Sequence, residues 1–334
     1  MRTLSAGSFI VAVLTAAFVQ AGSFNPQHVP ADAKWILHVD FETIESADTV
    51  RDLYEKRVSK HRFVRSLKEG RWQLDIDLQT NVKGLTLYGK QFAHTAGTLI
   101  VYTDAFKGQA TSELPDAPGH DTIPYRGHRL HTWSCGSKPT KEKTAEKNPT
   151  EDPLLAFAFP QNDVTVWAGD LNQLKAAVDA IDGRAEKLSE KKTLLSADSP
   201  HGTMFLVRAA GMQDTQLAES MPWLGQLKSF NYCEGIKDGR YFSRITAETG
   251  TPAVNRHVKN VVDGVVSAYW LMYGHQEPTS AQAENTTEQA SKMEMNVSVK
   301  EGQVEVRASG SVQQLGNEFS ELWEWIHEKP AKAK

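Results

Sequence analysis

Cysteine is scarce in this sequence, because only Cys135 and Cys233 occur in 334 residues. In an oxidising compartment these two residues could form one disulfide. The bond would close a loop of about 100 residues, which stabilises a fold by up to about 4.7 kcal/mol in the chain-entropy account. Two buried free thiols are an equally good interpretation, so the sequence leaves the pairing open.

A strong excess of charge of one sign is also missing. Lysine and arginine number 37 and aspartate and glutamate 41, so the formal net charge is only −4. Nucleic acid and anionic lipid both require a basic surface on their partner. We therefore expect neither of them to be the main partner of this protein.

Long apolar runs are absent as well, since a membrane span needs about 20 apolar residues. A shorter apolar stretch at residues 9–18 follows Arg2 and precedes the small-residue exit Val19, Gln20 and Ala21. This arrangement is typical of a cleavable signal peptide over residues 1–21. It predicts a secreted or periplasmic protein with no membrane span in the mature chain; an uncleaved N-terminal anchor is the alternative.

The remaining chain of about 310 residues suggests two structural units. We expect a first half at 22–190, with a mobile polar loop near 136–152, and a second half at 191–328, with a polar loop near 275–290. Residues 329–334 form a tail. Segment 108–124 is loop-like, and Asp170 and Thr251 are expected to cap helices.

The two halves contain similar blocks in the same order. Residues 164–174 align with 304–315, residues 82–88 with 227–232, and residues 97–103 with 239–246. Predicted strands occur mostly as adjacent pairs, with helices between the groups. This order predicts an α+β fold of two similar halves, each a mainly antiparallel sheet with helices packed on one face.

Three further runs, at residues 29–40, 82–89 and 261–268, carry a family resemblance. The chain resembles a family of exported bacterial proteins of unknown function over most of its mature length. The shared motifs are turns and strand starts. The resemblance therefore implies a compartment and a fold, but no activity.

Motifs for catalysis and cofactors are weak. Residues 84–91 imitate a phosphate-binding loop, but they read as a strand, and Gln91 replaces the hydroxyl residue that the motif requires. Asp75 and Asp77 begin like a calcium loop that lacks its glycine and its final glutamate. The sequence contains no Gly-x-Ser-x-Gly or His-Glu-x-x-His motif, so no catalytic residue and no cofactor are assigned.

His120, His128 and His131 are the best candidates for metal ligands. Zinc needs three or four such ligands that converge. The odd spacing of His128 and His131 places them on opposite faces of a strand, which favours a simple surface cluster of histidines.

These observations favour an exported, non-enzymatic binding or scaffold protein of the cell envelope or the extracellular space. Its expected partner is a protein, a peptide or an envelope component, bound at a sheet face or between the halves. The alternative is a secreted hydrolase, with or without a metal, whose site forms only in the fold.

Overall fold

The structure, a computed structural model, describes residues 22–46, 82–92, 97–104, 120–134, 154–213, 218, 224–273, 294–300 and 303–311. Several predictions fall outside these residues: the signal peptide, the polar loops near 136–152 and 275–290, the tail, and Asp75 and Asp77.

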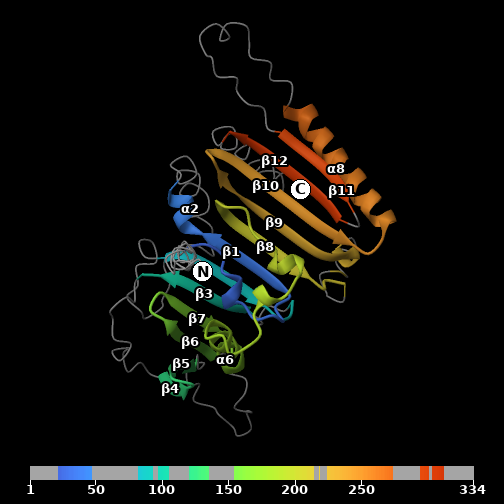
Figure 1. The fold of residues 1–334 in the computed structure, drawn as a ribbon. Coiled ribbons are helices and arrows are strands. Elements are labelled where there is room, and N and C mark those ends of the chain that lie inside the picture. The colour runs from blue at the N-terminus through green and yellow to red at the C-terminus, as the bar shows by residue number, and fades with distance from the viewer. Residues whose placement is uncertain are drawn as a thin grey trace, which may run out of the picture.

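The described strands form one antiparallel sheet of twelve strands (Figure 1). The first seven are β1 (Trp35–Asp40), β2 (Val82–Gly89), β3 (Gly97–Thr103), β4 (His120–Tyr125), β5 (His128–Ser134), β6 (Leu154–Gln161) and β7 (Val164–Ala168). The other five are β8 (Thr203–Ala210), β9 (Leu227–Lys237), β10 (Arg240–Thr249), β11 (Glu294–Lys300) and β12 (Gln303–Ser311). Along the sheet their order is β11-β12-β10-β9-β8-β1-β2-β3-β7-β6-β5-β4.

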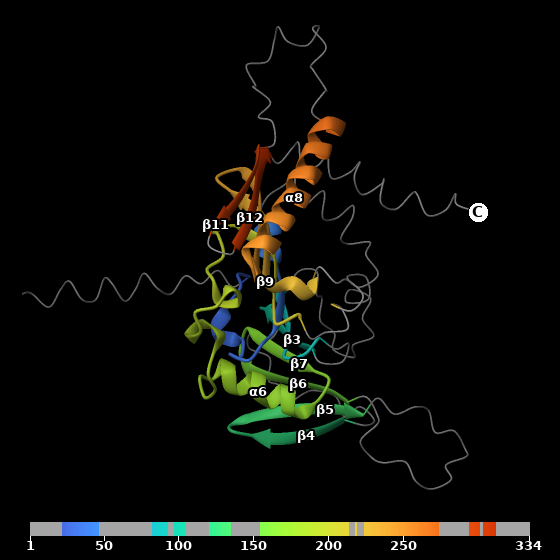
Figure 2. The same cartoon turned by 90° about the vertical axis from the view of Figure 1, so that its right-hand side faces the viewer.

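Among the described residues, the helices are few. They are the α-helices α2 (Phe41–Glu45), α6 (Leu171–Ile181) and α8 (Pro252–Tyr273), and the 3-10 helices η1 (Pro26–His28), η3 (Leu188–Glu190), η4 (Leu194–Ser196) and η5 (Leu224–Gln226). Helix α6 packs on β6 and β7, and α8 lies against β11 and β12 (Figure 2).

The predicted fold class is therefore wrong. The chain does not build two α+β halves with separate sheets under helical layers, because β1 pairs with β2 on one side and with β8 on the other. This central antiparallel pairing joins the first strand of each half and makes the sheet continuous. Sequence patterns indicate where strands lie but not which strands pair. The pairing of β1 with β8 decides whether the chain forms two sheets or one.

The strand order nevertheless repeats within the sheet. The first half contributes β1-β2-β3-β7-β6 from the centre outward, and the second contributes β8-β9-β10-β12-β11. The three aligned sequence blocks fall on equivalent strands: β2 with β9, β3 with β10, and β7 with β12. The hairpin of β4 and β5 extends the first half beyond this common order.

Local sequence explains several boundaries. The Asp170 carboxylate accepts hydrogen bonds from the N–H groups of Asn172 and Gln173, which caps α6 as predicted. Thr251 Oγ1 accepts from the Val254 N–H at the start of α8. Two hairpins turn through a residue pair with positive φ that ends in glycine, Arg126-Gly127 and Asp238-Gly239. Such pairs match the twist of antiparallel strands.

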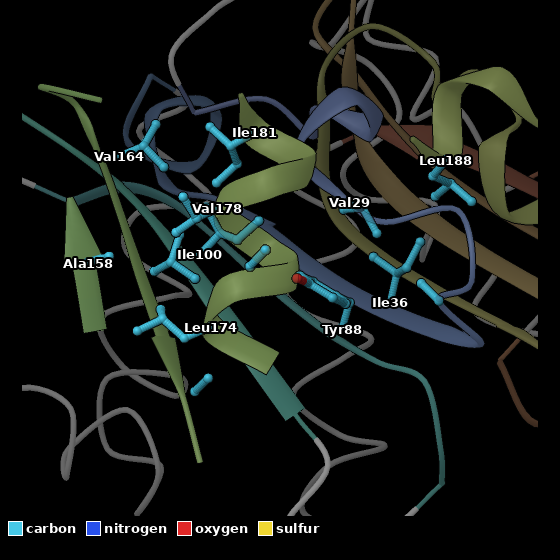
Figure 3. Packing of buried hydrophobic residues seen from close by; sticks show 14 of the residues in the cluster. Val29, Ile36, Tyr88, Ile100, Ala158, Val164, Leu174, Val178, Ile181 and Leu188 are labelled. Carbon is cyan, nitrogen blue, oxygen red and sulfur yellow. The ribbon is translucent and has the colours of Figure 1, made fainter. Parts of the chain in front are cut away.

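The largest apolar core lies between α6 and one face of the first half, which we call face A (Figure 3). Face A carries the side chains on the same side of the sheet as Ile36. Leu174 and Val178 of α6 pack there with Ile100 and Val166. All four side chains are fully buried, and burying one such side chain contributes about 1.5–3 kcal/mol. The opposite side of the sheet is face B.

Candidate functional site

The three predicted metal ligands do not converge. His120 on β4 and His131 on β5 meet on face B, with His120 Nε2 3.1 Å from His131 Nδ1. His128 lies on face A, where its Nε2 is 2.7 Å from Oδ2 of Asp182. In the part of the chain that the structure describes, no three potential ligands gather. His128 is thus held by an acidic side chain, and the two other histidines are too few for a zinc site.

His120 and His131 instead belong to a row of stacked rings that crosses four strands on face B. The row runs from His120 to Trp133, Phe157 and Trp167, with centroid separations of 4.3, 4.9 and 4.6 Å. His131 stacks on Phe157 at 5.1 Å. Such contacts contribute about 0.5–1.5 kcal/mol each beyond the area that they bury. We call these rings the aromatic row.

His131 is a buried side chain whose protonation is suppressed by its surroundings. The side chain is buried, and burial lowers its pKa to about 4, with a smaller contribution from His120. His131 is therefore neutral at pH 7. Its position in the row was not foreseen, because the contact with Phe157 depends on the register of β5 against β6.

A second buried polar group lies on face A where the two halves join. His38 on β1 is 1% exposed, and its Nδ1 lies 2.8 Å from Thr86 Oγ1. Burial lowers the pKa of His38 to about 3. The ring lies 5.6 Å from that of Phe24 and 6.4 Å from that of Tyr102. His38 is thus a neutral, buried histidine that packs beside two aromatic rings at this junction.

Arg208 on β8 is the charged member of the same region and is also 1% exposed. Its guanidinium donates to Asn231 Oδ1 at 3.0 Å, to the Leu195 carbonyl at 2.7 Å and to Ser199 Oγ at 3.0 Å. Burial lowers the pKa of Arg208 to about 10, so it remains charged at neutral pH. These bonds tie β8 and β9 to the segment around η4.

Cys233 is the cysteine that the structure describes. Cys233 on β9 is a buried free thiol whose pKa is raised by burial. Cys135 lies outside the described residues, but Ser134 ends β5, and six strands separate β5 from β9. At about 4.8 Å per strand, this separation is about 34 Å. A disulfide needs Cα atoms within about 7 Å, so the order of strands favours the free-thiol alternative.

The two ends of the sheet differ in chemistry. Strand β4 carries Pro124, which has no N–H to offer a further strand and protects that edge. Strand β11 reads Glu-Met-Asn-Val-Ser-Val-Lys, contains no proline and pairs only with β12 among the described strands. Val299 on it is 36% exposed, the one exposed large hydrophobic residue of the described part. We call the unpaired side of β11 the β11 edge.

Adjacent to this edge, charged side chains cross face A. Glu305 on β12 forms ion pairs with Arg244 on β10 and with Arg307. Burial alone would raise the pKa of Glu305, but the two arginines outweigh it and lower the pKa. Glu294 and Asn296 on β11 are exposed. The candidate functional site is thus an edge strand with a polar, charged face.

Comparisons with known proteins add little. No protein-family model and no curated protein match the sequence. Structures of TP0453 in crystal forms III and I align with TM-scores of 0.43 and 0.41 at 9% and 8% identity. These alignments cover 90% of this chain and 100% and 98% of the TP0453 chains. A similarity of this size supports no conclusion about function.

Among the described residues, no helix is long and apolar enough to cross a membrane.

Proposed function

We propose that this is an exported, non-enzymatic scaffold protein that associates with a second copy of itself through the β11 edge. The observation that carries the proposal is the self-complementary sequence of β11. An exposed edge strand offers a row of backbone donors and acceptors to another strand. A second copy is the partner whose side chains match this edge.

The match appears when β11 of one copy pairs antiparallel with β11 of a second copy, with the two Val297 residues opposite each other. The backbone position of Glu294 then lies opposite position 300 of the second copy, a lysine in the sequence, and Met295 lies opposite Val299. Asn296 faces Ser298, and Val297 faces its own equivalent. A two-fold axis perpendicular to the sheet keeps each pair on one face, as antiparallel pairing requires.

The energy of such pairing is modest. Each directly opposed favourable pair contributes roughly 0.2–1 kcal/mol, and symmetry doubles every pair except the central one. Backbone hydrogen bonds add to this sum. The β4 edge has no equivalent match because Pro124 interrupts it. The association is therefore directed to one end of the sheet.

Other observations support a binding role over a catalytic one. His120 and His131 lie within a stack of aromatic rings, and His128 is paired with Asp182. His38 is enclosed by rings, and Cys233 is buried. None of these contacts favours the alternative prediction of a hydrolase.

Sedimentation equilibrium of the chain beginning at residue 22, over about 1–100 µM, tests the proposal. We expect a monomer–dimer equilibrium. Glu294→Lys should weaken the dimer about tenfold, because it opposes like charges twice across the axis. The exchange Glu294→Lys with Lys300→Glu should restore the original affinity, while Asp121→Lys on the β4 edge should change nothing.

Two results would overturn the proposal. A wild-type chain that remains monomeric throughout this range excludes self-association. A dimer that Glu294→Lys weakens and the charge exchange fails to restore excludes the β11 pairing. Circular dichroism of each variant verifies that the sheet is retained.

A further inference from the structure

Gly22 lies in a close-fitting, acidic site at the start of the described chain. It is buried, and its N–H donates to Oε2 of Glu42 at 3.0 Å. A Cβ added to Gly22 would lie 2.5 Å from Asp40 Oδ1 and 2.6 Å from the Lys83 carbonyl oxygen. The second neighbour is backbone and cannot move aside cheaply, so only glycine fits this position.

Two acidic side chains, Asp40 and Glu42, lie around Gly22. Asp40 is 1% exposed and accepts hydrogen bonds from the Thr43 N–H and hydroxyl and from the Ser23 hydroxyl. Burial raises the pKa of Asp40, and the nearby Glu42 adds to this effect. Two carboxylates therefore lie close to the Gly22 nitrogen.

One lysine offsets part of this charge. Lys83 Nζ lies 3.3 Å from Glu42 Oε1 and 2.7 Å from Asp104 Oδ2. Lys83 thus bridges Glu42 and Asp104, and Glu42 also accepts the hydrogen bond from the Gly22 nitrogen. Glu42 is therefore already placed to accept a charged donor at Gly22.

The predicted signal peptide ends at Ala21, so Gly22 is the first residue of the predicted mature chain. We propose that cleavage between Ala21 and Gly22 creates an α-ammonium that binds Glu42 and Asp40, and so locks the mature N-terminus into the sheet. The reaction is hydrolysis by a signal peptidase. Water breaks the Ala21–Gly22 amide, Ala21 leaves as a carboxylate, and the freed Gly22 amine takes up a proton.

The gain in stability comes from converting the neutral Gly22 N–H donor into a charged one, at a site whose acceptors are already in place. Hydrogen bonds with ionised partners are about twice as strong as neutral ones. The uncleaved chain has one amide N–H here, whereas the cleaved chain has an ammonium with three N–H donors. Removal of the leader thereby fixes the segment before η1 onto β1 and β2. This inference rests on predicted export and is independent of the β11 pairing.

Intact mass of the protein exported with its own leader tests the cleavage position. We expect a chain that begins at Gly22. A chain that begins elsewhere, or that retains the leader, overturns the proposal. This result does not depend on the oligomeric state, so it leaves the proposed scaffold function to be judged separately.

Stability of matched chains tests the ion pair. One chain begins at Gly22, and its control is acetylated on the Gly22 nitrogen, which keeps an N–H donor and removes the charge. We expect the unfolding equilibrium constant of the acetylated chain to be about tenfold larger. Glu42→Gln should produce a similar loss in the free-amine chain and only a small change in the acetylated one. Equal effects of Glu42→Gln in both chains would overturn the proposed lock.

Discussion

His38 provides the sharpest physical prediction, because it is a titratable group buried where the two halves of the sheet meet. Its side chain is 1% exposed and packs against Phe24 and Tyr102. Burial lowers its pKa from 6.5 to about 3, and the nearby Arg208 acts in the same direction. The folded protein therefore keeps His38 neutral at pH values where the unfolded chain protonates it.

The direction of the pH dependence follows from these two pKa values. Below pH 6.5 the unfolded state binds more protons than the folded state, so stability falls as the pH falls towards about 3. The linkage relation with the cited pKa values gives the size of this loss. Proton binding by His38 in the unfolded state lowers the free energy of unfolding by about 0.2 kcal/mol at pH 7 and by about 2 kcal/mol at pH 5. Burial also lowers the pKa values of His28 and His131, each to about 4, which adds to the total acid sensitivity.

A single variant separates His38 from the other groups. The free energy of unfolding is measured in urea at pH 7, 6 and 5 for the wild type, for His38→Gln, and for a control, His257→Gln, at an exposed position on α8. His38→Gln carries a constant cost from imperfect packing, and this cost cancels in the comparison across pH. The difference between wild type and His38→Gln should shrink by about 2 kcal/mol from pH 7 to pH 5. A difference that stays constant within 0.5 kcal/mol (about the error of such measurements) would refute the reasoning.

Other contacts yield shorter predictions. Arg208→Leu should destabilise the fold by about 3–5 kcal/mol in urea unfolding, because three acceptors, two of them on buried residues, lose their donor; a loss below about 1 kcal/mol would contradict this. Phe157→Ala should cost about 3–5 kcal/mol and remove near-ultraviolet circular dichroism of the aromatic row; an unchanged spectrum would mean that the rings do not stack. Thiol titration should find both Cys135 and Cys233 reactive in denaturant without reductant, and Cys233 unreactive in the native protein; no free thiol in denaturant would establish a disulfide.

Much of the local structure followed from sequence, because it depends on neighbouring residues. The strand reading of residues 84–91 predicted most of β2, and the expected caps Asp170 and Thr251 predicted the starts of α6 and α8. The sequence resemblance between residues 164–168 and 304–308 falls on β7 and β12, which occupy equivalent places in the strand order. Strand β4 was missed, because Asp121, Pro124 and their neighbours are typical of loops and become a strand only beside β5.

The overall arrangement depends on contacts between distant residues. Nothing in Trp35–Asp40 or Thr203–Ala210 taken alone reveals that β1 and β8 pair, and that pairing turned two expected sheets into one. The predicted metal site depended on the same kind of information. The odd spacing of His128 and His131 correctly placed them on opposite faces, whereas the meeting of His131 with Phe157 required the register of β5 against β6.

The most direct test of the central claim is a distance across the proposed β11 pairing. A spin label at Asn296→Cys, in a Cys135→Ser and Cys233→Ala background, reports the separation of two copies by electron paramagnetic resonance. In the proposed register, residue 296 faces residue 298 of the second copy, so the two labelled Cα atoms lie about 9 Å apart. We predict strong dipolar broadening that disappears on dilution with unlabelled protein. A dimer whose labels lie more than about 40 Å apart, as association through the β4 edge would require, would contradict the account.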